Sequence, residues 1–460
     1  MPIAVFYDLT LKCDICSYFK QKPKIMKSDV NVLSELEEIA NNLWNNFMFQ
    51  ASLGSKELFH SNMLAWLLQQ KDKNNKWYIF EKFLEIVLGI EVSSIEGVRV
   101  ERESDNLDII IKYLLKEDDK YICKLIVIEN KFKSLPDLQQ LSENDTKIDK
   151  IIKEKEKLNT WSDQEKRPDS FAGKEIERAL DKKILLTPHK PILDIKNTNH
   201  WISKTYNDNI ISLLNAICDK EYLNSDISLV VSKYKEFLEK ILRIMEIYTK
   251  EEVSSYNYYD KNNESIEYLK RIRIKDLVLK TIHNQISEQI KKKLDDNKYG
   301  NKLKSFVNKY SIINDGKKGD IFITAGYTNE SGISDIKIVI EKPYLVGIQL
   351  QGKLLRYYVE STEKKINIQF AKNIVEKENL WFIDITKENS TELLSGNGRK
   401  NDFCIGWDDK EIKFNSFCDN FIYLYKSLDE ELTVSDLVDE MVYIVEYVLK
   451  NIEKFKDCIP

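Results

Sequence analysis

Two apolar runs next to a short polar segment constrain the fold of this chain more than any other feature. The runs are LDIIIKYLL at 107–115 and KLIVIENKF at 124–132, and the polar stretch KEDDK follows the first of them. Apolar, β-branched runs of this length predict strands, and a short polar link predicts an antiparallel hairpin. The hairpin in turn predicts which residues face each other.

The register of this hairpin brings three chemically active residues together. A turn centred between residues 118 and 119 places Asp108 opposite Glu129, with Cβ atoms about 5 Å apart. Lys131 lies two residues beyond Glu129 and therefore on the same face of the strand. The side chain of Asn130 points the other way, but its backbone carbonyl stays near the pair.

Two carboxylates at the end of an apolar hairpin repel each other unless a cation neutralises them. Carboxylate oxygens favour a hard divalent ion, and Mg²⁺ is the usual one. Asp108 and Glu129 therefore predict a magnesium site. Lys131 beside it can hold an attacking water or offset charge on a phosphate oxygen. Because the acids repel each other without metal, removing either is expected to leave the metal-free protein as stable or more stable.

A surface hairpin with a cross-strand ion pair is the alternative explanation. An acid followed by Glu-x-Lys is a weak pattern in a chain of which 32% of the residues are charged. On spacing alone, the surface ion pair is the commoner case. The apolar residues at 109–111 and 125–128 favour a buried site, because a surface hairpin would alternate more. For Glu103, at the end of the preceding strand, structural and functional roles are equally open.

The pattern around the hairpin predicts an α/β domain, in which helices and strands surround one sheet. The expected helices cover residues 31–49, about 55–68, 77–88, 137–158, 206–218 and 230–248, and further strands cover 98–103 and 184–187. In the first helix, Leu33, Leu36, Ala40, Leu43 and Phe47 form one apolar stripe.

The rest of the chain predicts a second, α+β domain. Expected strands cover 320–327, 335–341, 346–351, 354–360, 366–370 and 381–386, and a last helix covers 435–455. No acid there belongs to a second Asp…Glu-x-Lys hairpin, so this domain is not expected to contain a second catalytic site of this kind. The expected division is an N-terminal segment at 1–30, the α/β domain at 31–250, a charged helical connector at 251–300, and a regulatory or substrate-binding domain at 301–460.

Composition limits the cellular setting and the partners. The net charge is −5, so a polyanion could bind only at a local positive patch. Seven cysteines scattered along the chain do not form a disulfide framework and fit a reducing compartment. The first residues lack a signal-peptide pattern, and no run reaches the roughly 18 apolar residues of a membrane span. A cytoplasmic location without membrane contact is therefore expected.

Several motifs, taken in order, resemble the PD-(D/E)XK nuclease superfamily, in a bacterial branch with an early ExxHSxxLAWLL helix. Here that helix is ELFHSNMLAWLL at 57–68, and the second strand of the hairpin ends in IENK at 128–131. Gln140-Leu141, ILLTP at 184–188, residues 201–206 and YKEFLEKI at 234–241 also match the branch. The resemblance covers about residues 31–250. A Tyr is usual shortly after Gln-Leu, and Asn144 stands there instead.

The resemblance implies a restriction-endonuclease-like core, a central mixed sheet flanked by helices, and it implies a role for each motif residue. Asp108 and Glu129 would bind Mg²⁺, for which Mn²⁺ can substitute, together with the carbonyl of Asn130. Lys131 would be the catalytic lysine. From the early helix, Glu57 would approach the metal, directly or through water or a second ion. Gln140 would position the water or the phosphate.

The function implied is a metal-dependent nuclease that acts on DNA rather than RNA, by analogy in phage defence or mobile-element biology. The alternative is a catalytically inactive nuclease fold that acts as a nucleic-acid-binding or regulatory module. The C-terminal domain is expected to bind substrate, a regulator or another copy of the chain. Intact Asp108, Glu129 and Lys131 favour the enzyme, because an inactive scaffold has no reason to keep a repelling buried pair.

Overall fold

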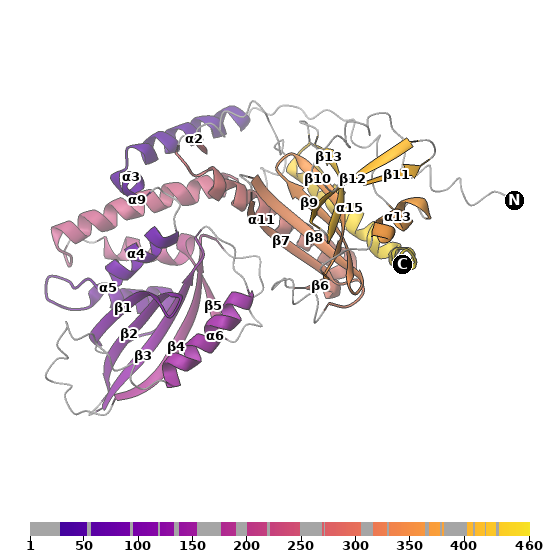
Figure 1. Cartoon of the computed structure of the whole chain (residues 1–460). Coiled ribbons are helices and arrows are strands. Elements are labelled where there is room, and N and C mark those ends of the chain that lie inside the picture. Colours follow the sequence, from indigo (N-terminus) through magenta and orange to yellow (C-terminus); the bar gives the residue numbers. More distant parts are fainter. Residues whose placement is uncertain are drawn as a thin grey trace.

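The computed structural model of the chain contains two β-sheets, each covered by helices (Figure 1). It describes residues 28–52, 57–92, 95–117, 120–132, 138–153, 176–189, 200–218, 221–248, 269–270, 272–304, 316–328, 331–363, 368–377, 380, 403–407, 410–418, 420–428 and 432–460. The expected segment at 1–30 falls almost wholly outside these residues, as do the hairpin turn at 118–119 and the expected strand at 381–386.

The N-terminal sheet is mixed and has five strands in the order β1-β2-β3-β4-β5. The strands are β1 Ile95–Ser104, β2 Leu107–Glu117, β3 Lys120–Asn130, β4 Ile176–Thr187 and β5 Trp201–Thr205. β1, β2 and β3 pair antiparallel, and β3, β4 and β5 pair parallel. The expected hairpin is therefore β2–β3, at the centre of a sheet.

The larger core lies on one face of this sheet. Strand alternation puts Ile109 and Ile111 on that face. There they pack with helices that precede the sheet in the sequence and with helices that follow it. These elements are α2 Ser28–Trp44, α3 Phe47–Ser52, α4 Glu57–Leu68, α5 Tyr78–Lys82, η1 Phe83–Leu88, η4 Tyr206–Ile210, α8 Ile211–Ile217 and α9 Ser225–Ile247. On the other face, Ile110 and Val127 pack against α6, Leu138–Lys153. The sheet is thus flanked by helices on both faces.

The C-terminal sheet has eight strands in the order β11-β12-β13-β10-β9-β8-β7-β6, all antiparallel except the short β6–β7 pair. The strands are β6 Leu303–Lys304, β7 Ile321–Thr328, β8 Ser331–Glu341, β9 Tyr344–Gln351, β10 Leu354–Ser361, β11 Phe403–Trp407, β12 Lys410–Cys418 and β13 Phe421–Ser427. Its core faces α11 Lys275–Leu294, α13 Ile368–Glu376, α15 Val434–Lys450 and α16 Ile452–Asp457. Between α11 and β6 lie the short turns η6 Asp295–Tyr299 and η7 Gly300–Lys302.

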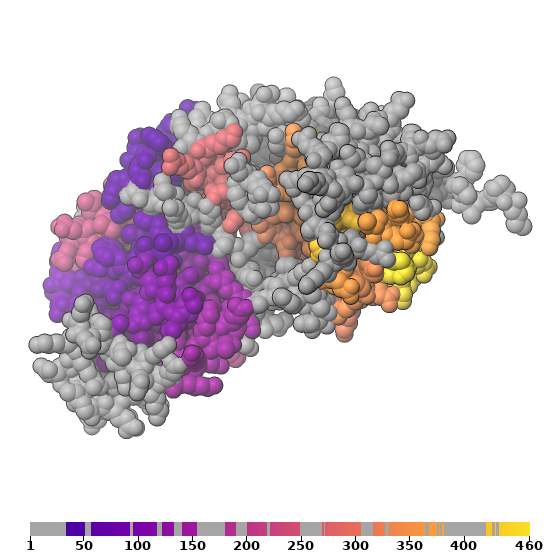
Figure 2. Space-filling view, in the orientation of Figure 1, coloured from indigo at the N-terminus to yellow at the C-terminus, as the bar shows by residue number. Residues whose placement is uncertain are grey.

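Helix α11 belongs to both cores. Leu277 and Val278 in its first half join the N-terminal core, whereas Ile286 and Ile290 join the C-terminal core. Figure 2 shows the two parts at opposite ends of the molecule, indigo to magenta at one end and orange to yellow at the other. No helix among the described residues is long and apolar enough to cross a membrane.

The fold class is as expected, but two local predictions are wrong and three strands were missed. Residues 366–370 were expected to form a strand; those of them that are described begin helix α13, because Phe370, Ala371 and Ile374 face the core at helical spacing. The first helix ends at Trp44, a second starts at Phe47, and the Phe47 side chain is 57% exposed rather than part of the stripe. The strands β11, β12 and β13 were not predicted at all.

Candidate active site

The β2–β3 hairpin has the register that its sequence predicts. Ile109 pairs with Ile128 and Lys116 with Tyr121, and the pattern continues unbroken between them. One step beyond Ile109 and Ile128, Asp108 and Glu129 are adjacent across the two strands. The backbone N–H of Asn130 donates to Asp108 Oδ2 at 2.7 Å, which fixes the Asp108 carboxylate against the end of β3.

A tight turn places Asp108 at the start of β2. Ser104 pairs with Leu107, so Asp105 and Asn106 form a two-residue hairpin loop, and their φ values are 54° and 57°. Two left-handed residues are what a type I′ hairpin turn requires, and Asp and Asn tolerate that conformation better than most residues. Glu103, the β1 residue across from Asp108, is exposed and also has a left-handed φ of 50°.

Among the described residues, three donors bond the Glu129 carboxylate. Its side chain is 1% exposed, and its Oε1 accepts from Lys131 Nζ at 2.7 Å and from Gln140 Nε2 at 2.7 Å. Its Oε2 accepts from Asn144 Nδ2 at 2.8 Å. Gln140 and Asn144 are four residues apart on α6 and so share one helix face. Helix α6 therefore supplies two of the donors that hold Glu129.

These three donors overturn part of the sequence expectation. Removing Glu129 would leave a buried ammonium and two amides without their acceptor, which costs stability rather than adding it. The expectation that removal is neutral or favourable therefore stays open only for Asp108, whose carboxylate accepts a single hydrogen bond among the described residues.

The side chain of Asn130 points to the opposite face, as strand alternation predicts. Its Nδ2 donates to Ser61 Oγ at 2.9 Å and to the Glu57 carbonyl at 3.3 Å, both on α4. Its Oδ1 accepts from Tyr206 OH at 3.0 Å. These bonds fasten the end of β3 to the helix that carries the ExxHS motif, so the backbone between Glu129 and Lys131 is held in place.

His60 on α4 has a structural role. Its ring is fully buried, stacks on Phe132 with centroids 3.6 Å apart, and accepts or donates one hydrogen bond, between Nδ1 and Tyr234 OH at 2.9 Å. Burial lowers the pKa of His60 to about 3, so the ring is neutral. Because Phe132 directly follows Lys131, this stack also anchors the end of the motif strand.

The pKa values of Asp108 and Lys131, the two titratable neighbours of Glu129, are both raised, although burial acts on them in opposite directions. Burial first, and then the negative charge of Glu129, raise the pKa of Asp108 to about 6, although the Asn130 N–H and Lys131 oppose this in part. For Lys131, burial lowers the pKa, but attraction and a hydrogen bond from Glu129, with Asp108 and Glu57, outweigh it and raise the pKa above its usual value. Lys131 is thus charged, and Asp108 is an acid that a cation would stabilise.

The hydrogen bonds show which oxygens could still bind a cation. A carboxylate oxygen has two lone pairs. Among the described residues, Glu129 Oε1 has two donors, Glu129 Oε2 and Asp108 Oδ2 have one each, and Asp108 Oδ1 has none. Carboxylate oxygens are hard ligands, and these still have lone pairs available. Because the two acids also repel each other and the pKa of Asp108 is raised, the site suits Mg²⁺ or Mn²⁺.

Glu57 lies close enough to add to the negative potential at Asp108, although it makes the smallest contribution to that pKa. Among the described residues, no three His, Cys, Asp or Glu side chains converge as a complete metal-binding cluster. The structure therefore brings Asp108, Glu129, Lys131 and Gln140 together and holds the Glu57 carboxylate farther out.

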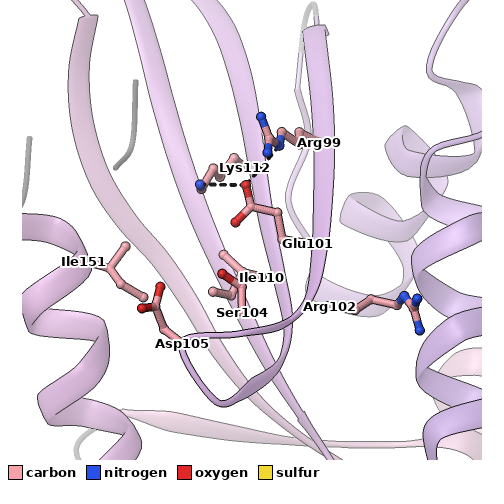
Figure 3. A pocket seen from close by; sticks show the side chains of 8 residues that line it. All are labelled: Arg99, Glu101, Arg102, Ser104, Asp105, Ile110, Lys112 and Ile151. Carbon is pink, nitrogen blue, oxygen red and sulfur yellow. Dashed lines mark hydrogen bonds and ion pairs between the residues drawn. The ribbon is translucent and has the colours of Figure 1, made fainter. Parts of the chain in front are cut away.

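A pocket of ≈590 Å³ opens on the same sheet face as Asp108, further along β1 and β2 (Figure 3). Arg99 Nε and Lys112 Nζ both lie 2.9 Å from Glu101 Oε1 at its wall. The lining residues are Arg99, Glu101, Arg102, Ser104, Asp105, Ile110, Lys112 and Ile151. The pocket contains neither Asp108 nor Glu129, and Ile110 is the lining residue nearest to Asp108 in the sequence.

Sequence reasoning missed the part that Asn144 plays. It stood out only as a departure from the Tyr usual at its position, yet its amide is a buried donor to Glu129. The signal was present, because Gln140, Asn144 and Lys147 recur at four- and three-residue spacing on one face of a predicted helix.

Comparison with known proteins gives one result. The family model of the PD-(D/E)XK nuclease superfamily matches residues 45–235. This range includes α4, the whole five-stranded sheet, α6 and the first half of α9. No curated protein and no solved structure matches the chain.

Proposed function

We propose that this chain, whose residues 45–235 form a domain of the PD-(D/E)XK nuclease superfamily, is a divalent-metal-dependent nuclease that hydrolyses phosphodiester bonds of DNA. One observation carries the proposal: Asp108, Glu129 and Lys131 meet at the end of one hairpin, with Lys131 Nζ 2.7 Å from Glu129 Oε1 and a raised pKa at Asp108. Two neighbouring acids, one of them bonded to a lysine, are the parts that metal-assisted hydrolysis needs.

Each residue has a role in this proposal. Asp108 and Glu129 hold Mg²⁺ or Mn²⁺ together with the carbonyl of Asn130, and Glu57 adds negative potential from α4. The ion, when bound, acts as a Lewis acid on the phosphate and lowers the pKa of a water. Lys131 carries a positive charge that can offset charge on a phosphate oxygen. Gln140, already bonded to Glu129, positions the water or the phosphate.

DNA is the preferred substrate in this proposal because most of the superfamily that the chain resembles cuts DNA. The net charge of −5 means that binding depends on local contacts and not on the overall field. The C-terminal sheet, which lies outside the matched range, would select the substrate, bind a regulator or join a second copy of the chain. A role in phage defence rests on analogy with the superfamily branch.

Cleavage assays separate an enzyme from an inactive nuclease fold. The full chain is incubated with plasmid, linear and single-stranded DNA and with RNA, in Mn²⁺ and in EDTA. We expect Mn²⁺-dependent cleavage of DNA that Lys131→Met and Asp108→Asn abolish. Asp149→Asn and Lys153→Met, exposed positions on α6, should keep the parent rate. An inactive fold would cut nothing and gain no thermal stability from Mn²⁺.

A further inference from the structure

Lys147 on α6 does not touch either acid of the proposed metal site, but its hydrogen bonds link the segments that hold them. Its ammonium donates to Asn144 Oδ1 at 2.9 Å and to the backbone carbonyl of Asn106 at 3.3 Å. Asn144, 0% exposed, donates in turn to Glu129 Oε2. A continuous series of hydrogen bonds therefore runs from Glu129 across α6 to the β1–β2 turn.

The charges at the two ends determine which atoms donate and which accept along this series of hydrogen bonds. An ionised carboxylate can only accept hydrogen bonds, and an ammonium can only donate them. The Asn144 amide lies between the two, so its NH₂ must face Glu129 and its oxygen must face Lys147. The positive charge of Lys147 also polarises the amide and strengthens the bond to Glu129.

The other bond of Lys147 reaches the segment that sets the position of Asp108. The Asn106 carbonyl belongs to the two-residue turn, and Asp108 follows two residues later at the start of β2. Helix α6 thus holds Glu129 through Asn144 and holds the turn before Asp108 through Lys147. The oxygens with acceptor capacity left, Glu129 Oε2 and those of the Asp108 carboxylate, depend on the same helix for their spacing.

We propose that Lys147 is a positioning residue of the metal site: through Asn144 and the Asn106 carbonyl it fixes Glu129 Oε2 relative to Asp108 and so sets the affinity for the divalent ion. This inference rests on the proposed metal site. It does not give Lys147 contact with substrate, and it assigns the residue a role distinct from that of Lys131, which bonds Glu129 Oε1 directly.

Calorimetric titration of the full chain with Mn²⁺ tests this role without measuring activity. Lys147→Met keeps an unbranched chain of nearly the same length and removes its donors. We expect it to weaken Mn²⁺ binding by about 10-fold or more, the usual effect of losing a partner that orients a metal ligand. Lys147→Arg keeps a charged donor and should restore most of the affinity. Lys153→Met, one of the matched controls on the same helix, should bind like the parent.

A double-mutant cycle separates a positioning role from simple packing. Asn144→Leu removes the amide between Lys147 and Glu129 and should itself weaken Mn²⁺ binding. If Lys147 acts through Asn144, adding Lys147→Met to Asn144→Leu should cost much less than it costs in the parent. Should Asn144→Leu fail to fold, Lys147→Met and Lys147→Arg decide the question alone, because Lys147 is only half-buried.

The outcomes are distinguishable. Mn²⁺ affinity of Lys147→Met equal to that of the parent, or no recovery in Lys147→Arg, would overturn the role of Lys147 while leaving the metal site intact. Fully additive losses in the cycle would overturn the action through Asn144. If the parent itself binds no Mn²⁺, the proposed function is wrong, and the role of Lys147 is wrong with it.

Discussion

Asp108 and Glu129 are neighbours in space, but the protein treats the two carboxylates differently. Among the described residues, Glu129 is held by three donors, two on α6 and one directly after β3, whereas Asp108 accepts one backbone N–H and is repelled by Glu129. The sequence predicted that the two acids meet, because a hairpin register follows from its turn. It could not predict this asymmetry, which depends on where α6 packs.

The raised pKa of Asp108 predicts a pH-dependent stability. Its pKa of about 6 in the fold lies above the usual 3.8, so its favourable contribution is present below about pH 4 and is lost as the pH rises through about 6. Asp108→Asn should therefore stabilise the metal-free chain at pH 8 by about 1–3 kcal/mol and change little at pH 4. Urea unfolding in EDTA at the two pH values measures this, with Asp149→Asn as the control. Equal stabilisation at both pH values would contradict the electrostatic cause.

Replacing Glu129 should change the stability in the opposite direction from replacing Asp108. Glu129→Ala leaves Lys131, Gln140 and Asn144 without their buried acceptor. The free energy of unfolding should fall by about 3–5 kcal/mol, the usual cost of breaking a buried ion pair from one side. The same urea experiment at pH 8 gives the comparison with Asp108→Asn. A Glu129→Ala variant as stable as the parent would show that these donors find other partners.

At the scale of elements, the β1–β2 turn is the local structure that fixes Asp108. Asn106 has a left-handed φ of 57°, which glycine adopts freely and a β-branched residue does not. Asn106→Val should lower the free energy of unfolding by about 1–2 kcal/mol, whereas Asn106→Gly should stay near the parent. Both keep the backbone carbonyl that Lys147 contacts. Equal stability of the two variants, measured by urea unfolding, would show that the turn conformation carries no strain.

Elements with strong periodicity were predictable and weakly patterned ones were not. The β2–β3 hairpin and α9 are long and regular, and both appear near the expected positions. INIQF alternates like a strand, but Phe370 at its end packs into the core together with Ala371 and Ile374 at helical spacing, and these contacts decide its conformation. Strand β13 contains the apolar run FIYLY at 421–425, a local signal that was missed, but the pairing of β11, β12 and β13 with β10 is long-range and could not be read from local sequence.

For the whole molecule, α11 makes the two sheets depend on each other. Leu277 lies in the core of the N-terminal part and Ile290 in that of the C-terminal part, and both side chains are at most 1% exposed. The division into a domain at 31–250, a connector and a domain at 301–460 remains a prediction. The expected connector at 251–300 contains α11, the helix that contributes to both cores.

This shared helix predicts cooperative unfolding. The full chain should melt in one calorimetric transition that Mn²⁺ moves upward. Ile290→Ala, although it lies in the C-terminal core, should lower that same midpoint, since removing a buried Ile side chain costs about 2–5 kcal/mol. Two transitions, of which Ile290→Ala lowers one and Mn²⁺ raises only the other, would show that the two parts unfold independently.

The central claim is that Asp108 and Glu129 share one divalent ion. Anomalous diffraction from crystals of the full chain grown with Mn²⁺ tests it most directly, because the signal locates the ion without assumptions about activity. We predict an Mn²⁺ peak about 2.1 Å from both Asp108 Oδ1 and Glu129 Oε2, beside the carbonyl of Asn130, and no peak there in Asp108→Asn. A Mn²⁺ ion bound elsewhere with this site vacant at saturating Mn²⁺, or an ion that stays in place in Asp108→Asn, would contradict the claim.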